Sequence, residues 1–180
     1  MKNLTVSTVA SLLLLAELMT TAAPAQAARP CSGGEKSHQF DFWIGEWDVT
    51  ENGRTAGANS IQPILDGCVL QEKWAGAGGS QGSSFNFYNP QTGKWRQFWV
   101  WRNGTTLDLE GQFQDGKMIL QGESVTPKGE KRLNRITWQA NSDGSVRQLW
   151  ETSSDGGTNW EKAFDGLYTR KAAAEKSPDR

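Results

Sequence analysis

The chain has 180 residues, with 19 Lys and Arg against 20 Asp and Glu, which give a formal net charge of −1. A near-neutral chain without a basic run lacks the positive surface that attracts nucleic acids and anionic membranes, so we expect neither as a partner. A single histidine, His38, and two distant cysteines argue against a zinc site and against a Ser-His-Asp triad. We therefore expect no metal and no cofactor.

The first 27 residues are predicted to be a secretory signal peptide that is cleaved. Lys2 supplies a positive start, Val9–Leu18 an apolar run, and Ala25-Gln26-Ala27 a small-x-small cleavage site. The apolar run of about ten residues is too short for a membrane span, which needs about twenty. We expect an exported protein, periplasmic or secreted, with one domain over residues 28–170.

Both cysteines, Cys31 and Cys68, lie in the part that would be exported. In an oxidising compartment an even pair of cysteines most simply forms a disulfide. The bridge would link the mature N-terminus to the start of a later strand. By closing a loop of about 37 residues, it would stabilise the fold by a few kcal/mol.

Turn signals rich in Gly, Asn, Asp and Pro recur roughly every eight to twelve residues, which is typical of antiparallel β structure. After the signal, we identify no segment with the period and length of an α-helix. Ten strands are predicted: Phe42–Thr50, Thr55–Gln62, Cys68–Trp74, Ser83–Tyr88, Trp95–Trp101, Thr105–Phe113, Lys117–Val125, Arg132–Ala140, Val146–Thr152 and Trp160–Arg170. Consecutive strands joined by tight turns predict an all-β fold, an antiparallel up-and-down β-barrel, because closure removes exposed edges.

Three segments between or after these strands, two of which overlap a strand end, carry their own predictions. Ala75–Ser84 contains four glycines and is expected to be a flexible hairpin loop, or else a lid over the barrel. Ser153–Trp160 matches the Asp-box pattern and predicts a turn in which Asp155 bonds backbone N–H groups while Trp160 packs underneath. The tail 171–180, Ala-rich and then charged, is expected to fray.

The Gly45-Glu46-Trp47 step, ahead of an all-β meander, resembles the calycin superfamily of lipocalin-like barrels. The ordered motifs resemble those of an exported bacterial family of unknown function related to the DUF1579 group: Phe40–Val49, Asp66-Gly67-Cys68, Asn86-Phe87-Tyr88, Trp95-Arg96-Gln97 and Phe164–Tyr168. This resemblance covers nearly the whole mature chain. Calycin barrels place the first-strand Trp at the closed end beneath a basic side chain, which implies a cation–π contact between Trp47 and Arg170.

Haem-binding barrels with a similar opening motif, the nitrobindin-like group, ligate iron through a His on a late strand. Here His38 precedes the first strand. We therefore expect His38 at the surface or at one end of the barrel, and we do not expect haem.

The predicted strand Trp95–Trp101 has two mixed faces, since alternation places Gln97 and Trp99 on one side and Arg96 and Phe98 on the other. In one register the interior is aromatic and rich in amides, with nine candidate ligand-binding residues: Asn86, Tyr88, Gln97, Trp99, Trp101, Asn134, Trp138, Gln148 and Trp150. The opposite register would favour an anionic ligand by placing a charged set inside: Arg96, Arg135, Arg147 and Glu151. A slip of one residue exchanges the two faces, so both registers remain open, as does a packed barrel merely braced by its Trp residues.

Carboxylates are plentiful along the predicted strands: Glu46, Asp48, Glu72, Asp108, Glu110, Glu123 and Glu151. Two of them converging inside the barrel would support acid–base chemistry. Asp108 and Glu110 share a strand face opposite Leu107 and Leu109, so we expect this pair outside and the leucines inside.

Three functions are compatible with these patterns. We favour a secreted or periplasmic lipocalin-like protein that binds a small hydrophobic or aromatic molecule in its barrel. One alternative is a carbohydrate-binding or cell-wall-binding module, because exposed Trp faces stack on sugar rings. The other is a lipocalin-like isomerase, cyclase or hydrolase in which a luminal carboxylate or Tyr88 moves a proton. We expect binding rather than catalysis, and fold resemblance alone does not decide between them.

Overall fold

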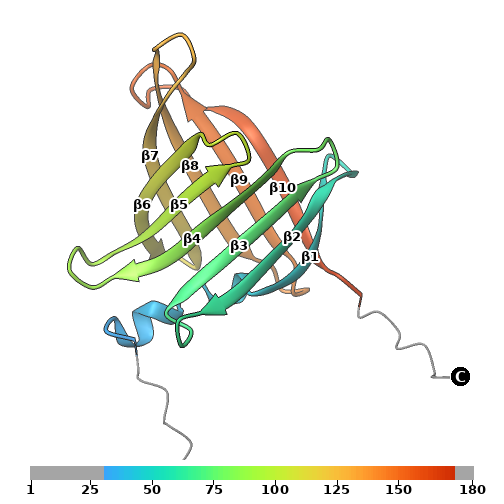
Figure 1. Cartoon of the computed structure of the whole chain (residues 1–180), viewed down its shortest axis with the longest axis vertical. Helices are drawn as coiled ribbons and strands as arrows, with labels where there is room; N and C mark the ends of the chain where they lie inside the picture. The colour runs from blue at the N-terminus through green and yellow to red at the C-terminus, as the bar shows by residue number, and fades with distance from the viewer. Residues whose placement is uncertain (1–30, 173–180) are drawn as a thin grey trace, which may run out of the picture.

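The computed structural model describes residues 31–172, so the expected signal peptide at 1–27 and most of the expected tail at 171–180 lie outside this range. Ten antiparallel strands form a closed barrel in which each strand pairs with its sequence neighbours and the last pairs with the first (Figure 1). The strands are β1 (Gly45–Glu51), β2 (Arg54–Ile64), β3 (Val69–Gly76), β4 (Gln81–Asn89), β5 (Lys94–Trp101), β6 (Thr106–Gln114), β7 (Lys117–Val125), β8 (Lys131–Ala140), β9 (Val146–Ser153) and β10 (Glu161–Arg170). The all-β up-and-down barrel predicted from turn spacing is confirmed.

Because consecutive strands run in opposite directions, the connections between them lie alternately at the two ends of the barrel. The hairpins β1–β2, β3–β4, β5–β6, β7–β8 and β9–β10 lie at one end, which we call the open end. The other end, the closed end, carries the remaining turns and two short 3-10 helices, η1 (Gly34–His38) and η2 (Asp41–Trp43). Among residues 31–172 the helices are short, and none meets the length and hydrophobicity that a membrane crossing requires.

The first strand begins later than predicted, because Asp41–Trp43 forms η2 and leads into the barrel instead of pairing along it. Phe40 and Trp43 are fully buried, and their rings stack with centroids 4.9 Å apart. Their spacing of three residues places both side chains on one side of a 3-10 turn. Both rings also meet Trp138, at 5.2 and 5.4 Å, so this aromatic cluster fills the closed end.

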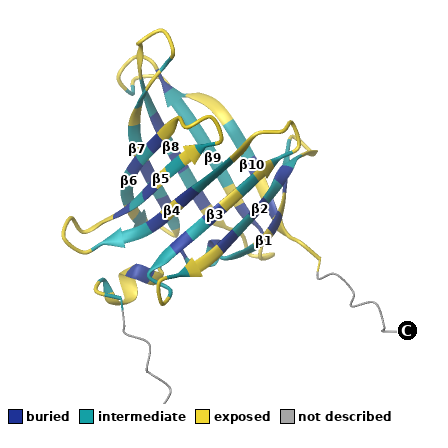
Figure 2. Cartoon of the chain, viewed as in Figure 1, coloured by how far each residue is buried: buried dark blue, intermediate teal, exposed yellow. Residues whose placement is uncertain are grey.

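Burial alternates along the strands and resolves the register (Figure 2). On β5, Trp95 and Gln97 are buried, whereas Phe98 is exposed. The charged residues of the alternative register lie outside, in ion pairs across neighbouring strands: Arg96 with Asp108, Arg135 with Glu151, and Arg147 with Asp165. The aromatic and amide face therefore lines the interior, and the register with charges inside is wrong.

The pair Asp108 and Glu110 lies on the outer face, as predicted. Asp108 accepts hydrogen bonds from Arg96, and Glu110 lies 3.4 Å from the Lys94 Nζ. Leu107 and Leu109 are buried inside.

Two long-range contacts hold the closed end together. The predicted disulfide between Cys31 and Cys68 is present, with 5.4 Å between the Cα atoms, and it ties the segment before η1 to the β2–β3 turn. On the other side, Trp47 of β1 pairs in register with Arg170 of β10. The Arg170 guanidinium carbon lies 4.6 Å from the Trp47 ring centroid, in the arrangement that the calycin resemblance implies.

The loop predicted over Ala75–Ser84 is too long. β3 extends to Gly76 and β4 starts at Gln81, so only a short hairpin turn remains over residues 77–80, where the Gly76 N–H donates to Ser80 O at 2.7 Å. Two of the four glycines serve packing. A Cβ on Gly82 would lie 2.2 Å from the Trp99 ring, and a Cβ on Gly76 would lie 2.1 Å from Ser80 Oγ and 3.0 Å from the Trp74 indole nitrogen. Glycine therefore makes room for an indole ring at Gly82 and for the turn residue Ser80 at Gly76.

The turn predicted from the Asp-box pattern is confirmed. Asp155 Oδ1 accepts the backbone N–H of Asn159 at 2.9 Å, and these hydrogen bonds lower the pKa of Asp155 to about 2. Trp160 donates its indole N–H to the Gly157 carbonyl at 3.0 Å. The guanidinium of Arg135 lies 4.1 Å from the Trp160 ring centroid, so the motif serves the structure of this turn.

Candidate functional site

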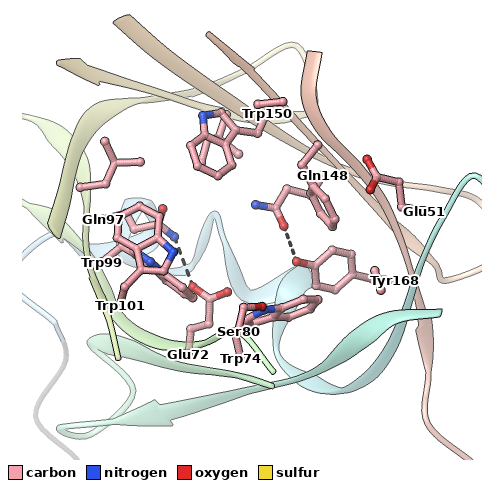
Figure 3. A pocket seen from close by; sticks show the side chains of 15 residues that line it. Glu51, Glu72, Trp74, Ser80, Gln97, Trp99, Trp101, Gln148, Trp150 and Tyr168 are labelled. Carbon is pink, nitrogen blue, oxygen red and sulfur yellow. Dashed lines mark hydrogen bonds between the residues drawn. The ribbon is translucent and has the colours of Figure 1, made fainter. Parts of the chain in front are cut away.

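A cavity of about 370 Å³ lies inside the barrel at the open end (Figure 3). Its wall takes residues from eight of the ten strands and from the β3–β4 turn: Glu51, Ala56, Glu72, Trp74, Ser80, Gln97, Trp99, Trp101, Leu107, Ile136, Gln148, Trp150, Ala163, Phe164 and Tyr168. The cavity exists at this end because η2 fills only the closed end of the barrel.

The part of the cavity wall nearest the open end is aromatic. Trp99 and Trp101 meet edge to face with ring centroids 5.6 Å apart, and Trp101 lies 6.4 Å from Trp150. On the other side, the Trp74 and Phe164 rings meet edge to face at 6.3 Å. All five side chains are half-buried, so their rings are available to a molecule in the cavity.

The floor of the cavity, which is the part toward the closed end, is polar and centres on Glu72 of β3. Its side chain is 4% exposed, and its two carboxylate oxygens accept hydrogen bonds from Asn59 Nδ2 at 2.7 Å and Ser84 Oγ at 2.6 Å. Burial raises the pKa of Glu72 to about 7, against the opposing effect of these two hydrogen bonds. Glu72 therefore exchanges its proton near neutral pH.

A hydrogen-bond network extends from Glu72 across the floor. Asn59 Nδ2 also lies 3.4 Å from the Tyr168 hydroxyl, which in turn donates to Gln148 Oε1. Burial and the neighbouring charge of Glu72 raise the pKa of Tyr168 above its ordinary value, so the phenol keeps its proton. The floor thus places one ionisable carboxyl group beside neutral donors and acceptors.

A second branch of the network connects Glu72 to side chains of β4 and β5. Gln97 Nε2 donates to Asn86 Oδ1 at 2.8 Å and lies 3.5 Å from Glu72 Oε2. Asn86 Nδ2 donates to Ser84 Oγ at 2.8 Å. These contacts orient the Gln97 and Ser84 side chains toward Glu72.

Five of the nine predicted ligand-binding residues line the cavity: Gln97, Trp99, Trp101, Gln148 and Trp150. Two more contact residues of the lining, since Asn86 Oδ1 accepts from Gln97 and Asn134 Oδ1 accepts the Trp150 indole N–H at 3.1 Å. Trp138 and Tyr88 share the inward face but lie outside the lining.

Trp138 belongs to the aromatic cluster of the closed end, and Tyr88 lies near that end, 6.3 Å from the Trp95 ring. Strand alternation predicts which face a residue occupies but not its height along the barrel axis.

Sequence reasoning assigned no ligand-binding role to Glu72, Trp74 or Tyr168, which all line the cavity. For Glu72 a signal was present, because Leu70, Glu72 and Trp74 alternate on one strand face between apolar neighbours. A carboxylate between two large apolar residues at a spacing of two indicates a buried acid.

The single histidine lies at the closed end, away from the cavity. His38 is exposed, and its Nδ1 lies 2.9 Å from Asp41 Oδ2, in agreement with the expected position at a barrel end. Within residues 31–172, no group of three or more His, Cys, Asp or Glu side chains is arranged to hold a metal ion.

No family model matches the chain, and no curated protein matches it either. The function is therefore inferred from the cavity itself.

Proposed function

We propose that this lipocalin-like barrel is exported and binds a small ring-bearing molecule in the open-end cavity. The observation that carries the proposal is a cavity of about 370 Å³ in which five aromatic rings stand over a hydrogen-bonding floor. Ligand cavities in proteins measure roughly 300–1,000 Å³ and combine apolar walls with a few convergent polar groups. A volume near the lower limit favours a compact ligand.

Export outside the cytoplasm is supported by the Cys31–Cys68 disulfide, because such bridges persist in oxidising compartments. The signal sequence predicted at residues 1–27 agrees with this location. The resemblance of the motif series to the exported DUF1579-related family adds to the proposal.

Binding inside the barrel is favoured over stacking on an insoluble glycan. Residues 31–172 include all nine Trp residues of the chain, and each of these side chains is buried or half-buried. A flat glycan surface requires exposed rings. The four Trp residues at the cavity are instead placed to surround a small molecule.

One observation favours a second candidate function, proton transfer to or from the bound molecule. Glu72 lines the cavity and has a pKa of about 7, which suits a general acid or base at neutral pH. In this alternative Glu72 replaces Tyr88, which lies outside the cavity. The test is to incubate the ligand with protein in D₂O: deuterium at a carbon, lost in Glu72→Gln, supports catalysis, whereas an unchanged ligand supports binding alone.

The proposed binding is tested by native mass spectrometry of protein purified from its source, searching for a retained small molecule. We expect an added mass that disappears on denaturation. The variant Ala56→Phe places a ring in the cavity and should abolish retention, whereas Ala58→Phe, on the outer face of β2, should not.

A chain that retains no molecule and shows no Trp fluorescence response to a panel of ring compounds would contradict the proposal. Equal retention by the Ala56→Phe and Ala58→Phe variants would place the ligand outside this cavity.

A further inference from the structure

Building on the proposed function, we infer that the bound molecule is an organic cation, with a positively charged nitrogen next to its ring and Glu72 as its counter-ion. The inference names the class of ligand that the cavity selects. Three observations carry it: a buried carboxyl group that lacks a counter-ion, an indole wall, and the charge balance of the lining.

Glu72 is a buried carboxyl group held only by neutral donors. Asn59 and Ser84 donate to its two oxygens, and Gln97 Nε2 lies 3.5 Å away. The ion pairs among the described residues all involve other carboxylates. Buried carboxylates are ordinarily paired with a positive group. In the protein alone, Glu72 lacks such a partner, and a cationic ligand would supply it.

The carboxyl group has room for that partner. An ionised carboxylate offers about four lone-pair sites, and the two close donors occupy one on each oxygen. Figure 3 shows the Glu72 side chain rising from β3 into the cavity. Gln97 Nε2 approaches Oε2 as well, at 3.5 Å, so the second lone pair of Oε1 is the one available to a charged nitrogen placed in the cavity.

The aromatic wall has the chemistry that organic cations prefer. Indole faces carry negative potential, and Trp is the strongest cation–π partner among the side chains. Four indoles line the cavity: Trp74, Trp99, Trp101 and Trp150. An anion of the same size would meet these faces and the Glu72 carboxylate unfavourably.

The other titratable groups near Glu72 leave the lining neutral or negative. Tyr168 stays protonated, and Glu51 at the rim accepts the backbone N–H of Asp165 at 3.0 Å. No Lys or Arg belongs to the cavity lining. Arg132 occupies an inward-facing position in the alternation along β8, but it is not among the residues that line the cavity. A cation that binds to protonated Glu72 displaces its proton to solvent, so affinity for a permanent cation should rise with pH through about 7.

The test uses isothermal titration calorimetry with three single-ring probes: benzyltrimethylammonium, neutral benzyl alcohol and anionic benzenesulfonate. Because none of the three changes charge between pH 5.5 and 8.5, any pH dependence reports on the protein. We expect benzyltrimethylammonium to bind most tightly at pH 8.5 and to lose affinity by up to roughly 30-fold at pH 5.5, where Glu72 is mostly protonated. Benzyl alcohol should bind equally at both pH values.

Two variants locate the effect. Glu72→Gln should weaken benzyltrimethylammonium binding at pH 8.5 at least tenfold, remove its pH dependence and leave benzyl alcohol unchanged. Glu123→Gln, an exposed carboxylate on the outer face paired with Lys131, should behave like the parent chain. The pH series on the parent chain needs no variant, so it stands even where Glu72→Gln does not fold.

The outcomes separate this inference from the proposed function. Benzyl alcohol binding as tightly as the cation, or a cation affinity independent of pH, would overturn the cation inference and leave a cavity for neutral rings. Tighter binding of benzenesulfonate would also overturn it. If none of the probes binds at millimolar concentration and native mass spectrometry finds no retained molecule, the proposed function fails as well.

Discussion

The two ends of the barrel use the same residue type in opposite ways. At the closed end Trp43, Trp47 and Trp138 are fully buried in a solid cluster. At the open end the Trp side chains are half-buried around a cavity. The strands alternate in the same way throughout, so the difference comes from what enters the barrel. Phe40 and Trp43, at the start and end of the η2 turn, insert two rings at one end, whereas the hairpins at the other end insert none. The candidate site lies where this filling stops.

The largest expected effect contrasts one Trp from each end. Trp43→Ala should reduce the free energy of unfolding by about 5 kcal/mol, because it leaves a large cavity in the packed cluster. Trp101→Ala should cost roughly 1 to 2 kcal/mol, because its ring is already half exposed to the open cavity. Urea unfolding measures both, and equal losses would show that the two ends are packed alike.

Removal of the disulfide should lower the stability of the fold without changing the cavity at the open end. Cys31→Ser together with Cys68→Ser releases a loop closed over a sequence separation of 37. The unfolded chain then gains entropy, and stability should fall by about 4 kcal/mol. Ligand affinity at the open end should stay unchanged in the fraction that remains folded. A large loss of affinity in that fraction would mean that the disulfide also shapes the cavity.

Glu72 should give the open end its own pH dependence of stability. Its folded-state pKa is raised from 4.5 to about 7, so the folded chain binds more protons than the unfolded chain between these values. The contribution of Glu72 to the free energy of unfolding is fully present below pH 4.5. It falls by about 3 kcal/mol as the pH rises through 7.

Urea unfolding of the parent chain and Glu72→Gln between pH 4 and 8 checks this pH dependence. The variant should show a flatter profile and exceed the parent in stability at pH 8. An unchanged slope in Glu72→Gln would assign the dependence to another group.

The smallest expected effect concerns the rim of the closed end. Arg170→Gln removes the cation–π contact with Trp47 and the hydrogen bond to the Ile44 carbonyl, so it should cost about 1 kcal/mol. Thermal unfolding measures it, with Arg54→Gln in an exposed position as the control. A shift no larger than that of Arg54→Gln would mean that solvent competes fully for Arg170.

Much of the fold was predictable because its signals are local. Turn residues predicted the strand order, and alternation predicted which residues share a face, although not which face lies inside. The start of β1 was missed because Phe42 and Trp43 match a strand as well as a 3-10 turn, and the burial of Trp43 depends on the distant Trp138. The partners of Glu72 lie 12 and 13 residues away on neighbouring strands, so its surroundings depend on strand pairing, and Tyr168 of β10 reaches Asn59 only through barrel closure.

Barrel closure also has a consequence for synthesis. β1 and β10 meet at Trp47 and Arg170, which lie 123 positions apart in the sequence. Until the last strand is available, β1 has an unpaired edge, and pairings of such high contact order form slowly. A chain truncated before β10 would lack Tyr168 and leave two open edges, so it should be prone to association and degradation. The chain must therefore be nearly complete before either the barrel or its cavity can form.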